Sequence, residues 1–107
     1  MSAAAERYQL RSYRVDPDHL DDFLRTWENT VVPLRERYGL HTLEAWLSLE
    51  GSRFTWVSYV DEGADYAAVE AAYVASHDRR TLTPDPAAWL LETDIHFARP
   101  VHGSAVG

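Results

Sequence analysis

Cysteine and lysine are missing from the 107-residue sequence, so its ten basic residues are all arginine. Without cysteine the chain can form no disulfide, thiolate zinc site or cysteine nucleophile. Without lysine it can form no Schiff base and has no lysine anchor for a phosphate group. Any reaction that this protein catalyses must therefore use histidine, arginine, tyrosine or carboxylate side chains.

Excess positive charge and long apolar runs are missing as well. The formal net charge is −7 at pH 7, and Arg79 and Arg80 are the only two adjacent basic residues. Nucleic acids and acidic membranes bind to clustered positive charge, so we expect neither as a partner. No apolar run approaches the roughly 20 residues that span a bilayer, and residues 1–6 do not resemble a signal peptide. These absences predict a cytoplasmic protein.

The sequence also lacks the common signatures of cofactor and metal sites. Its five glycines are isolated, so there is no glycine-rich loop for a nucleotide phosphate. The histidines, at positions 19, 41, 77, 96 and 102, include no i, i+4 pair that would bind zinc from one helix face. We therefore expect neither a cofactor nor a metal ion.

The residues that are present predict one folded domain over 7–101, with flexible tails at 1–6 and 102–107. Apolar residues make up 46% of the chain and aromatic residues 12%, which is more than a disordered chain contains. Alternating polarity predicts strands, and apolar spacings of three and four predict helices. The predicted strands are 8–15, 41–49, 53–60 and 92–98. The predicted helices are 16–38, bent at Pro33, and 64–76, with a loop at 77–86 and a helical turn at 87–91.

This order, strand, helix, strand, strand, helix, strand, predicts a ferredoxin-like α+β fold with a four-stranded antiparallel sheet and both helices on one face. The second and third strands carry apolar or aromatic residues on both faces, so both faces need cover. The chain is too short to add a third layer. We expect a homodimer in which the sheets of two copies face each other; the alternative is a monomer with a solvated second face.

Several segments, in their order and spacing, resemble a known family: YQLRSYRV, VVPLRERYGL, EAWLS, RFTWVSYVD and TLTPDPAAWLLETDIHFARPV. Together they are similar to the NIPSNAP-type members of the dimeric α+β barrel superfamily, from about Tyr8 to Val101. That superfamily includes small antibiotic biosynthesis monooxygenases, which need neither metal nor flavin. The resemblance implies a homodimer with a ligand pocket between each sheet and its helices. It does not imply one reaction, because function depends on the site and not on the fold.

Chemistry of the monooxygenase type needs an aromatic pocket, a base and donors that hold an anion. The predicted substrate-binding residues are Tyr13, Trp46, Trp56, Tyr59 and His77. Trp46 faces Trp56 across the hairpin if the turn consists of 50–52; with a two-residue turn, Thr55 or Val57 takes the place of Trp56. Both tryptophans alternatively pack in the core or in the dimer interface, and His77 is alternatively a solvated loop residue.

The predicted catalytic residues are Arg11, His96 and Asp94. Arg11 shares a strand face with Tyr13, and both can donate to a substrate oxygen; the alternative for Arg11 is an ion pair, for example with Glu44. His96 and Asp94 lie on one face of the last strand, about 7 Å apart along it, and can bracket one ligand. Neutral imidazole is a natural base at pH 7. The alternative is that this face meets solvent or the partner chain.

Two functions follow from these residues. The first is a cofactor-independent enzyme of secondary metabolism that oxygenates, cyclises or isomerises an aromatic or polyketide-like molecule held between sheet and helices. The second is a non-catalytic module that binds a hydrophobic ligand or assembles with another protein. A closed cavity with His or Arg beside Trp or Tyr favours the enzyme, whereas a filled core favours the module.

Overall fold

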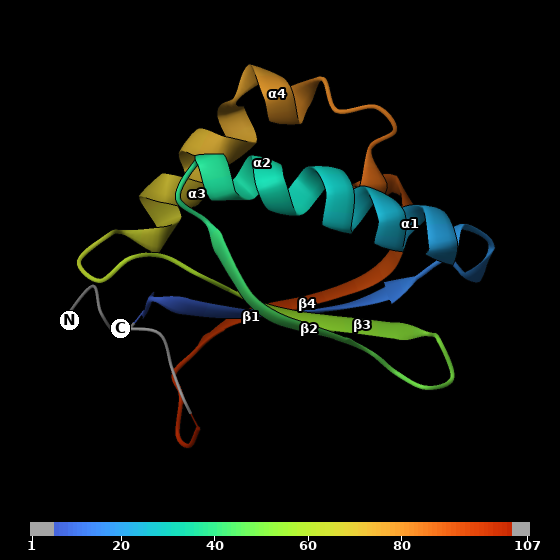
Figure 1. Ribbon diagram of the computed structural model, residues 1–107, viewed down its shortest axis with the longest axis horizontal. Coiled ribbons are helices and arrows are strands. Elements are labelled where there is room, and N and C mark those ends of the chain that lie inside the picture. The colour runs from blue at the N-terminus through green and yellow to red at the C-terminus, as the bar shows by residue number, and fades with distance from the viewer. Residues whose placement is uncertain (1–5, 104–107) are drawn as a thin grey trace.

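The computed structural model describes residues 6–103, so most of both predicted tails lies outside the described residues. Its four strands form one antiparallel sheet in the order β2-β3-β1-β4. They are β1 (Tyr8–Val15), β2 (His41–Leu47), β3 (Arg53–Tyr59) and β4 (Leu90–Ala98). All the helices cover one face of this sheet, and the other face is open (Figure 1). The predicted ferredoxin-like α+β fold is confirmed.

The first helical segment connects β1 to β2. It begins with a 3-10 turn and a short α-helix, passes through a π-helical turn, and ends in a second α-helix: η2 (Pro17–His19), α1 (Leu20–Thr26), η3 (Trp27–Val31) and α2 (Val32–Arg37). Asp16 caps its start, accepting a hydrogen bond from the Asp18 N–H at 3.0 Å. The π-helical turn η3 ends two residues before Pro33, the residue where we predicted a bend. Gly39, with φ +91°, provides the left-handed residue after the helix.

The second helical segment connects β3 to β4. Its main helix is α3 (Tyr66–Ala75), whose N-terminus is capped by Asp65 through the Ala68 N–H at 3.3 Å. The segment predicted as a loop contains one further short helix, α4 (His77–Arg80), because the Ser76 hydroxyl accepts a hydrogen bond from the Arg79 N–H at 3.1 Å. The predicted helical turn before the last strand is the 3-10 helix η4 (Pro86–Trp89).

The β2–β3 hairpin loop is longer than either turn considered from the sequence, but Thr55 takes the place of Trp56 opposite Trp46, as the second alternative had it. Trp46 pairs with Thr55, and Ala45 pairs with Trp56, so the two tryptophans lie on opposite faces of the sheet. Their exposed fractions are 52% and 1%. Residues 48–52 join the strands. Ser48 sets the register because its hydroxyl accepts hydrogen bonds from the N–H groups of Ser52, at 3.2 Å, and Arg53, at 3.0 Å.

Glu50 completes this hairpin loop. Its carboxylate accepts hydrogen bonds from the hydroxyls of Ser48 and Ser52, both at 2.6 Å. The Ser48 bond, followed by the Ser52 bond, holds the pKa of Glu50 below its ordinary value. The loop therefore has its own side-chain hydrogen bonds, which alternation along the strands does not predict.

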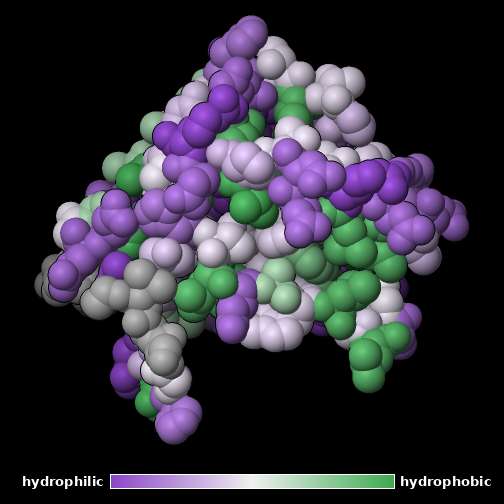
Figure 2. All heavy atoms as spheres, in the orientation of Figure 1, coloured by the Kyte–Doolittle hydropathy of each residue, from purple (hydrophilic) through white to green (hydrophobic). Residues whose placement is uncertain are grey.

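The two faces of the sheet differ in what covers them. On the helix side, two clusters of buried side chains form the core: Tyr13, Val15, Phe23, Phe54 and Trp56 in one, and Leu34, Leu40, Val60, Tyr66 and Tyr73 in the other. The strand register places alternate residues on the open face, including Leu10, Val57, Tyr59 and Trp46. Hydrophilic residues cover the helices, while hydrophobic residues gather lower, at the level of the sheet (Figure 2). No helix within 6–103 is long and apolar enough to cross a membrane.

Candidate functional site

A cavity of about 150 Å³ lies between the sheet and the helices that cover it. Strands β1 and β3 and the first residue of β4, Leu90, supply its sheet side, and the two helical segments supply its other walls. Its polar and aromatic lining includes Arg11, Tyr13, Trp27, Arg35, Trp56 and Glu70. An apolar cavity of about this volume holds one benzene ring in an engineered protein, so there is room here for a single ring.

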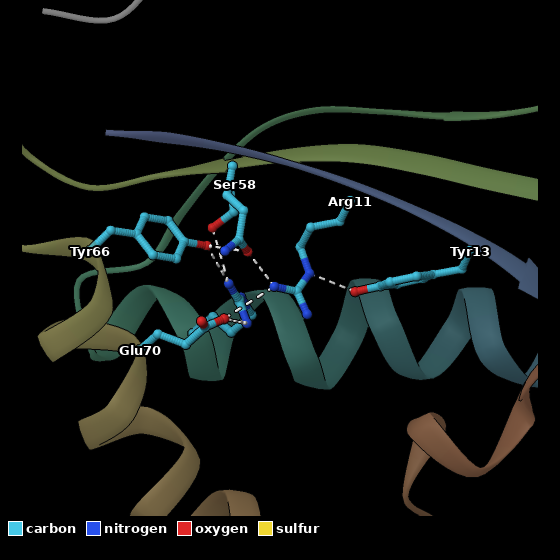
Figure 3. Close-up of polar contacts among 7 residues, drawn as sticks. Arg11, Tyr13, Ser58, Tyr66 and Glu70 are labelled. Atoms are coloured by element: carbon cyan, nitrogen blue, oxygen red, sulfur yellow. Dashed lines mark hydrogen bonds and ion pairs between the residues drawn. The ribbon is translucent and has the colours of Figure 1, made fainter. Parts of the chain in front are cut away.

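Arg11 links the sheet to α3. The pleat of β1 directs Arg11 and Tyr13 to the helix side, and the Arg11 Nε donates a hydrogen bond to the Tyr13 hydroxyl oxygen at 2.6 Å. The Arg11 Nη1 donates to the amide oxygen of Gln9 and, at 3.1 Å, to Glu70 Oε2. Figure 3 shows the guanidinium group between Tyr13 and Glu70, in the space between sheet and helix. Its side chain is 14% exposed.

Arg35 extends from α2 toward the same carboxylate and is 4% exposed. Its Nη2 donates hydrogen bonds to the hydroxyls of Ser58 at 3.0 Å and Tyr66 at 3.1 Å (Figure 3). Its Nη1 lies 4.0 Å from Glu70 Oε2, the oxygen that also accepts from Arg11. Two guanidinium groups therefore share one carboxylate.

The indole ring of Trp56 lies beneath both guanidinium groups. The Arg35 Cζ is 4.9 Å from the ring centroid and the Arg11 Cζ is 5.5 Å from it, which are cation–π distances. Trp27 packs edge-on against the same ring, with centroids 5.3 Å apart and planes at 76°. The floor of the cavity is thus aromatic, and its polar groups are predominantly cationic.

Burial and neighbouring groups act in opposite directions on the charge of Arg11. Burial alone lowers the pKa of Arg11, but Tyr13 and then Glu70 raise it, and together they place it above its ordinary value. The guanidinium group is therefore charged at every physiological pH. On the opposite wall, burial raises the pKa of Tyr73, so its hydroxyl is neutral.

The model for NIPSNAP matches residues 8–105 of the chain. The chain belongs to the NIPSNAP family. No protein with a curated description matches it.

Three solved structures share the fold of this NIPSNAP protein at low sequence identity. A NIPSNAP domain protein from Burkholderia xenovorans is 17% identical, with 92% of this chain and 98% of that chain covered and a TM-score of 0.76. A NIPSNAP family protein with unknown function from Agrobacterium tumefaciens is 15% identical, with coverages of 91% and 89% and a TM-score of 0.75. A Bacteroides thetaiotaomicron protein named after antibiotic biosynthesis monooxygenases is 16% identical, with 99% of each chain covered and a TM-score of 0.70.

Three of the predicted site residues of this NIPSNAP protein meet at the cavity: Arg11, Tyr13 and Trp56. Alternation along β1 placed Arg11 and Tyr13 on one face, and their pairing with Trp56 and Phe54 places that face under the helices. The ion pair of Arg11 is formed with Glu70 of α3 and not with Glu44, which lies on the open face with Val57.

The other predicted residues lie elsewhere. His96 pairs with Leu10, and Asp94 pairs with Ser12, so both point away from the helices while Arg11 points toward them. The His96 Nδ1 lies 3.6 Å from Asp94 Oδ1, and the side chains are 55% and 72% exposed. Trp46 and Tyr59 are also on the open face, and His77 is an exposed residue at the start of α4. One chain therefore does not bring His96 and Asp94 to Arg11.

Arg35 and Glu70 line the cavity but were not predicted from the sequence, although their spacing contains a signal. Arg35 follows Val31 by four residues and precedes Tyr38 by three, so it falls on the apolar stripe of its helix. Glu70 is placed in the same way between Tyr66 and Tyr73. A charged residue on the apolar face of a helix needs a buried partner. The two partners here are on different helices, which no local pattern indicates.

The donor set fits an organic ligand better than a metal ion. Within the described part of the chain there is no group of three or more His, Cys, Asp or Glu that could hold a metal. Glu70 is the single carboxylate among the described lining residues, and no histidine is among them. Chemically, the site can hold a planar ring on indole surfaces and donate hydrogen bonds to an oxygen atom of that ligand.

Proposed function

We propose that this NIPSNAP protein is a cofactor-independent enzyme that binds an aromatic or polyketide-like small molecule between its sheet and its helices. The reaction class is oxygenation, cyclisation or isomerisation in secondary metabolism. The observation that carries the proposal is the juxtaposition of Arg11, Tyr13 and Trp56 in one cavity of about 150 Å³. It supplies an aromatic surface and oriented donors, which such chemistry needs.

Each of these residues has a distinct role in the proposal. Trp56 and Trp27 hold the ring of the ligand through edge and face contacts. Arg11 uses its Nε and Nη1 in hydrogen bonds within residues 6–103, and its Nη2 is proposed to donate to a ligand oxygen. Tyr13 accepts the Arg11 bond with its oxygen and retains its own proton to donate. Both groups stabilise negative charge that develops on the ligand oxygen during reaction.

Turnover in air is the test of this proposal. We expect the purified protein to convert at least one member of a panel of single-ring phenols and 1,3-diketones, followed by product chromatography. Arg11→Gln is expected to lower kcat/KM about tenfold or more, because a hydrogen bond to a charged donor is lost. Arg14→Gln is the matched control, since Arg14 is half exposed and lies on the open face of the same strand. Absence of turnover across the panel, or equal turnover by both variants, contradicts the proposed enzyme.

A second candidate function is a non-catalytic ligand-binding or assembly module. The absence of histidine among the described lining residues favours it, because the usual neutral base is not at the ligand. Both functions predict that an aromatic ligand binds. They differ in whether the bound ligand is recovered unchanged, which the same chromatography measures.

We propose further that the protein is a homodimer in which the open faces of two sheets pack together. Leu10 and Val57 pair at the centre of that face, and Tyr59 and Trp46 add aromatic rings nearer its margins. Trp46, at 52% exposed, is unusually open for its size. His96 and Asp94 lie on this face, so the proposal places them at the interface and not at the cavity.

Sedimentation tests the dimer. At micromolar concentration we expect a particle of twice the chain mass of 12.2 kDa. Val57→Arg places a charge in the middle of the proposed interface and is expected to yield monomers, because a buried unpaired charge opposes association. Leu49→Arg, at a fully exposed position of the hairpin loop, is the control and is expected to stay dimeric. A wild-type monomer contradicts the proposal.

A further inference from the structure

We infer that the ligand enters this cavity as an anion: one planar ring that bears a carboxylate or phenolate oxygen. The inference rests on the proposed function, because it takes the cavity between sheet and helices as the ligand site. It goes further by assigning the charge, the size and the hydrogen-bonding character of the ligand. Charge, unpaired donors and volume each support it.

The charge of the site is unbalanced. Arg11 and Arg35 are both largely buried, at 14% and 4% exposed, and they share the single carboxylate of Glu70. The contact from Arg35 to that carboxylate is 4.0 Å long, against 3.1 Å for the contact from Arg11. Arg79 also lines the cavity, but it pairs with Asp85 at 3.2 Å. Among the residues that the structure describes, one positive charge at the cavity is therefore without a counter-ion, which is unfavourable away from water and is relieved by an anionic ligand.

The unpaired polar atoms of the lining are donors, and this observation is independent of the charge. Arg35 Nε, Trp27 Nε1 and Trp56 Nε1 are buried and find no hydrogen-bond partner within residues 6–103. Trp56 and Arg35 are more than nine-tenths buried, so solvent does not satisfy them. A neutral amide or alcohol brings donors of its own, whereas a carboxylate or phenolate oxygen only accepts. These three donor atoms lack acceptors in the described part of the protein, so they favour a ligand whose oxygen atoms accept hydrogen bonds.

The volume limits the ligand to one ring. A cavity of about 150 Å³ matches the space that a benzene molecule occupies in an engineered apolar cavity. The indole rings of Trp56 and Trp27 line the cavity with their planes at 76°, and the Arg11 and Arg35 guanidinium groups above Trp56 add positive charge to the same lining. A larger ligand would have to leave its other rings outside the cavity.

Calorimetric titration at pH 9 with four single-ring compounds tests the inference. Benzoate and 4-nitrophenolate are the anionic probes, and benzamide and benzyl alcohol are their neutral counterparts. We expect at least one anion to bind about tenfold or more tightly than either neutral compound, the discrimination that a charge-assisted hydrogen bond supplies. Preference for benzoate over 4-nitrophenolate identifies a carboxylate ligand, and the reverse identifies a phenolate. Equal binding of anions and neutral compounds, or no saturable binding of either anion, overturns the inference.

Variants link the selectivity to the cavity. Arg11→Gln is expected to weaken binding of the preferred anion about tenfold and to leave benzamide binding unchanged. Arg14→Gln, on the open face, is expected to change neither. Equal weakening by both variants would overturn the assignment of the site. The comparison of anions with neutral compounds uses the wild-type protein and so stays decisive even where a variant fails to fold.

The inference and the proposed function can fail separately. If the protein converts a neutral compound that binds as tightly as its anionic counterpart, this result contradicts the inference of an anionic ligand and supports the proposed enzyme. Selective binding of an anion with no conversion of any compound in the panel supports the inference and contradicts the enzyme. The calorimetric and chromatographic results therefore answer different questions.

Discussion

Trp56→Ala is expected to lower the free energy of unfolding by about 3–5 kcal/mol, the range for truncating a large buried aromatic side chain. Trp56 is 1% exposed and packs against the ring of Trp27, with centroids 5.3 Å apart. It also supports the guanidinium groups of Arg11 and Arg35 from below. Truncation removes these contacts and enlarges a cavity that already exists. Urea denaturation followed by circular dichroism measures the loss.

Trp46→Ala is the matched control for this prediction. Trp46 lies on the neighbouring strand but on the open face, and it is 52% exposed. Its truncation is expected to cost clearly less than that of Trp56, and the cost should depend on protein concentration because the proposed dimer buries this face. Equal, concentration-independent losses for the two variants would contradict the register that places them on opposite faces.

Most of the fold follows from local patterns in the sequence. The alternation of β1, the cap at Asp16 and the glycine at position 39 each act over a few residues, and the strand 8–15 and the ends of the first helical segment lie close to where they were predicted. The register between β2 and β3 does not follow from such local patterns. It depends on the Ser48 hydroxyl, which bonds the backbone of the loop, and on an irregularity between Thr42 and Glu44. A shift of one residue there decides which face a tryptophan occupies.

Three residues of the site were predicted: Arg11 and Tyr13 from the alternation of β1, and Trp56 of β3 as a partner of Trp46, which lies on the other face of the sheet. Arg11 and Tyr13 are two residues apart on β1, so alternation alone places them together. His96 and Asp94 are related in the same way on β4, but both faces of the sheet carry apolar residues, and the sequence does not say which face the helices cover. Arg35 and Glu70 meet only when α2 and α3 dock on the sheet. Such a contact depends on tertiary packing.

Glu70→Gln is expected to destabilise the protein by about 1–3 kcal/mol, because it removes the carboxylate that two guanidinium groups share. Glu70 is itself 26% exposed, so water screens part of the effect. Arg35, at 4% exposed, has no such access to water and carries most of the loss. Urea denaturation at pH 7 measures the change in the free energy of unfolding.

A second variant separates the charge effect from a loss of packing. Adding Arg35→Met to Glu70→Gln removes one of the two uncompensated cations and retains an apolar chain of similar length. We therefore expect the double variant to recover stability relative to Glu70→Gln, as replacement of buried ionic groups by hydrophobic residues often does. Further destabilisation by Arg35→Met in this background would show that the hydrogen bonds to Ser58 and Tyr66 outweigh the charge.

An anion in the solution should replace the missing carboxylate. If the cavity binds benzoate, saturating benzoate stabilises the native state by mass action, and its effect on unfolding should be larger for Glu70→Gln than for the wild type. The reason is that the variant presents two cations with no internal counter-ion, so its affinity for an external anion is higher. Benzamide at the same concentration is the control and should not distinguish the two proteins. Equal stabilisation of both proteins by benzoate would mean that Glu70 does not set the charge of the site.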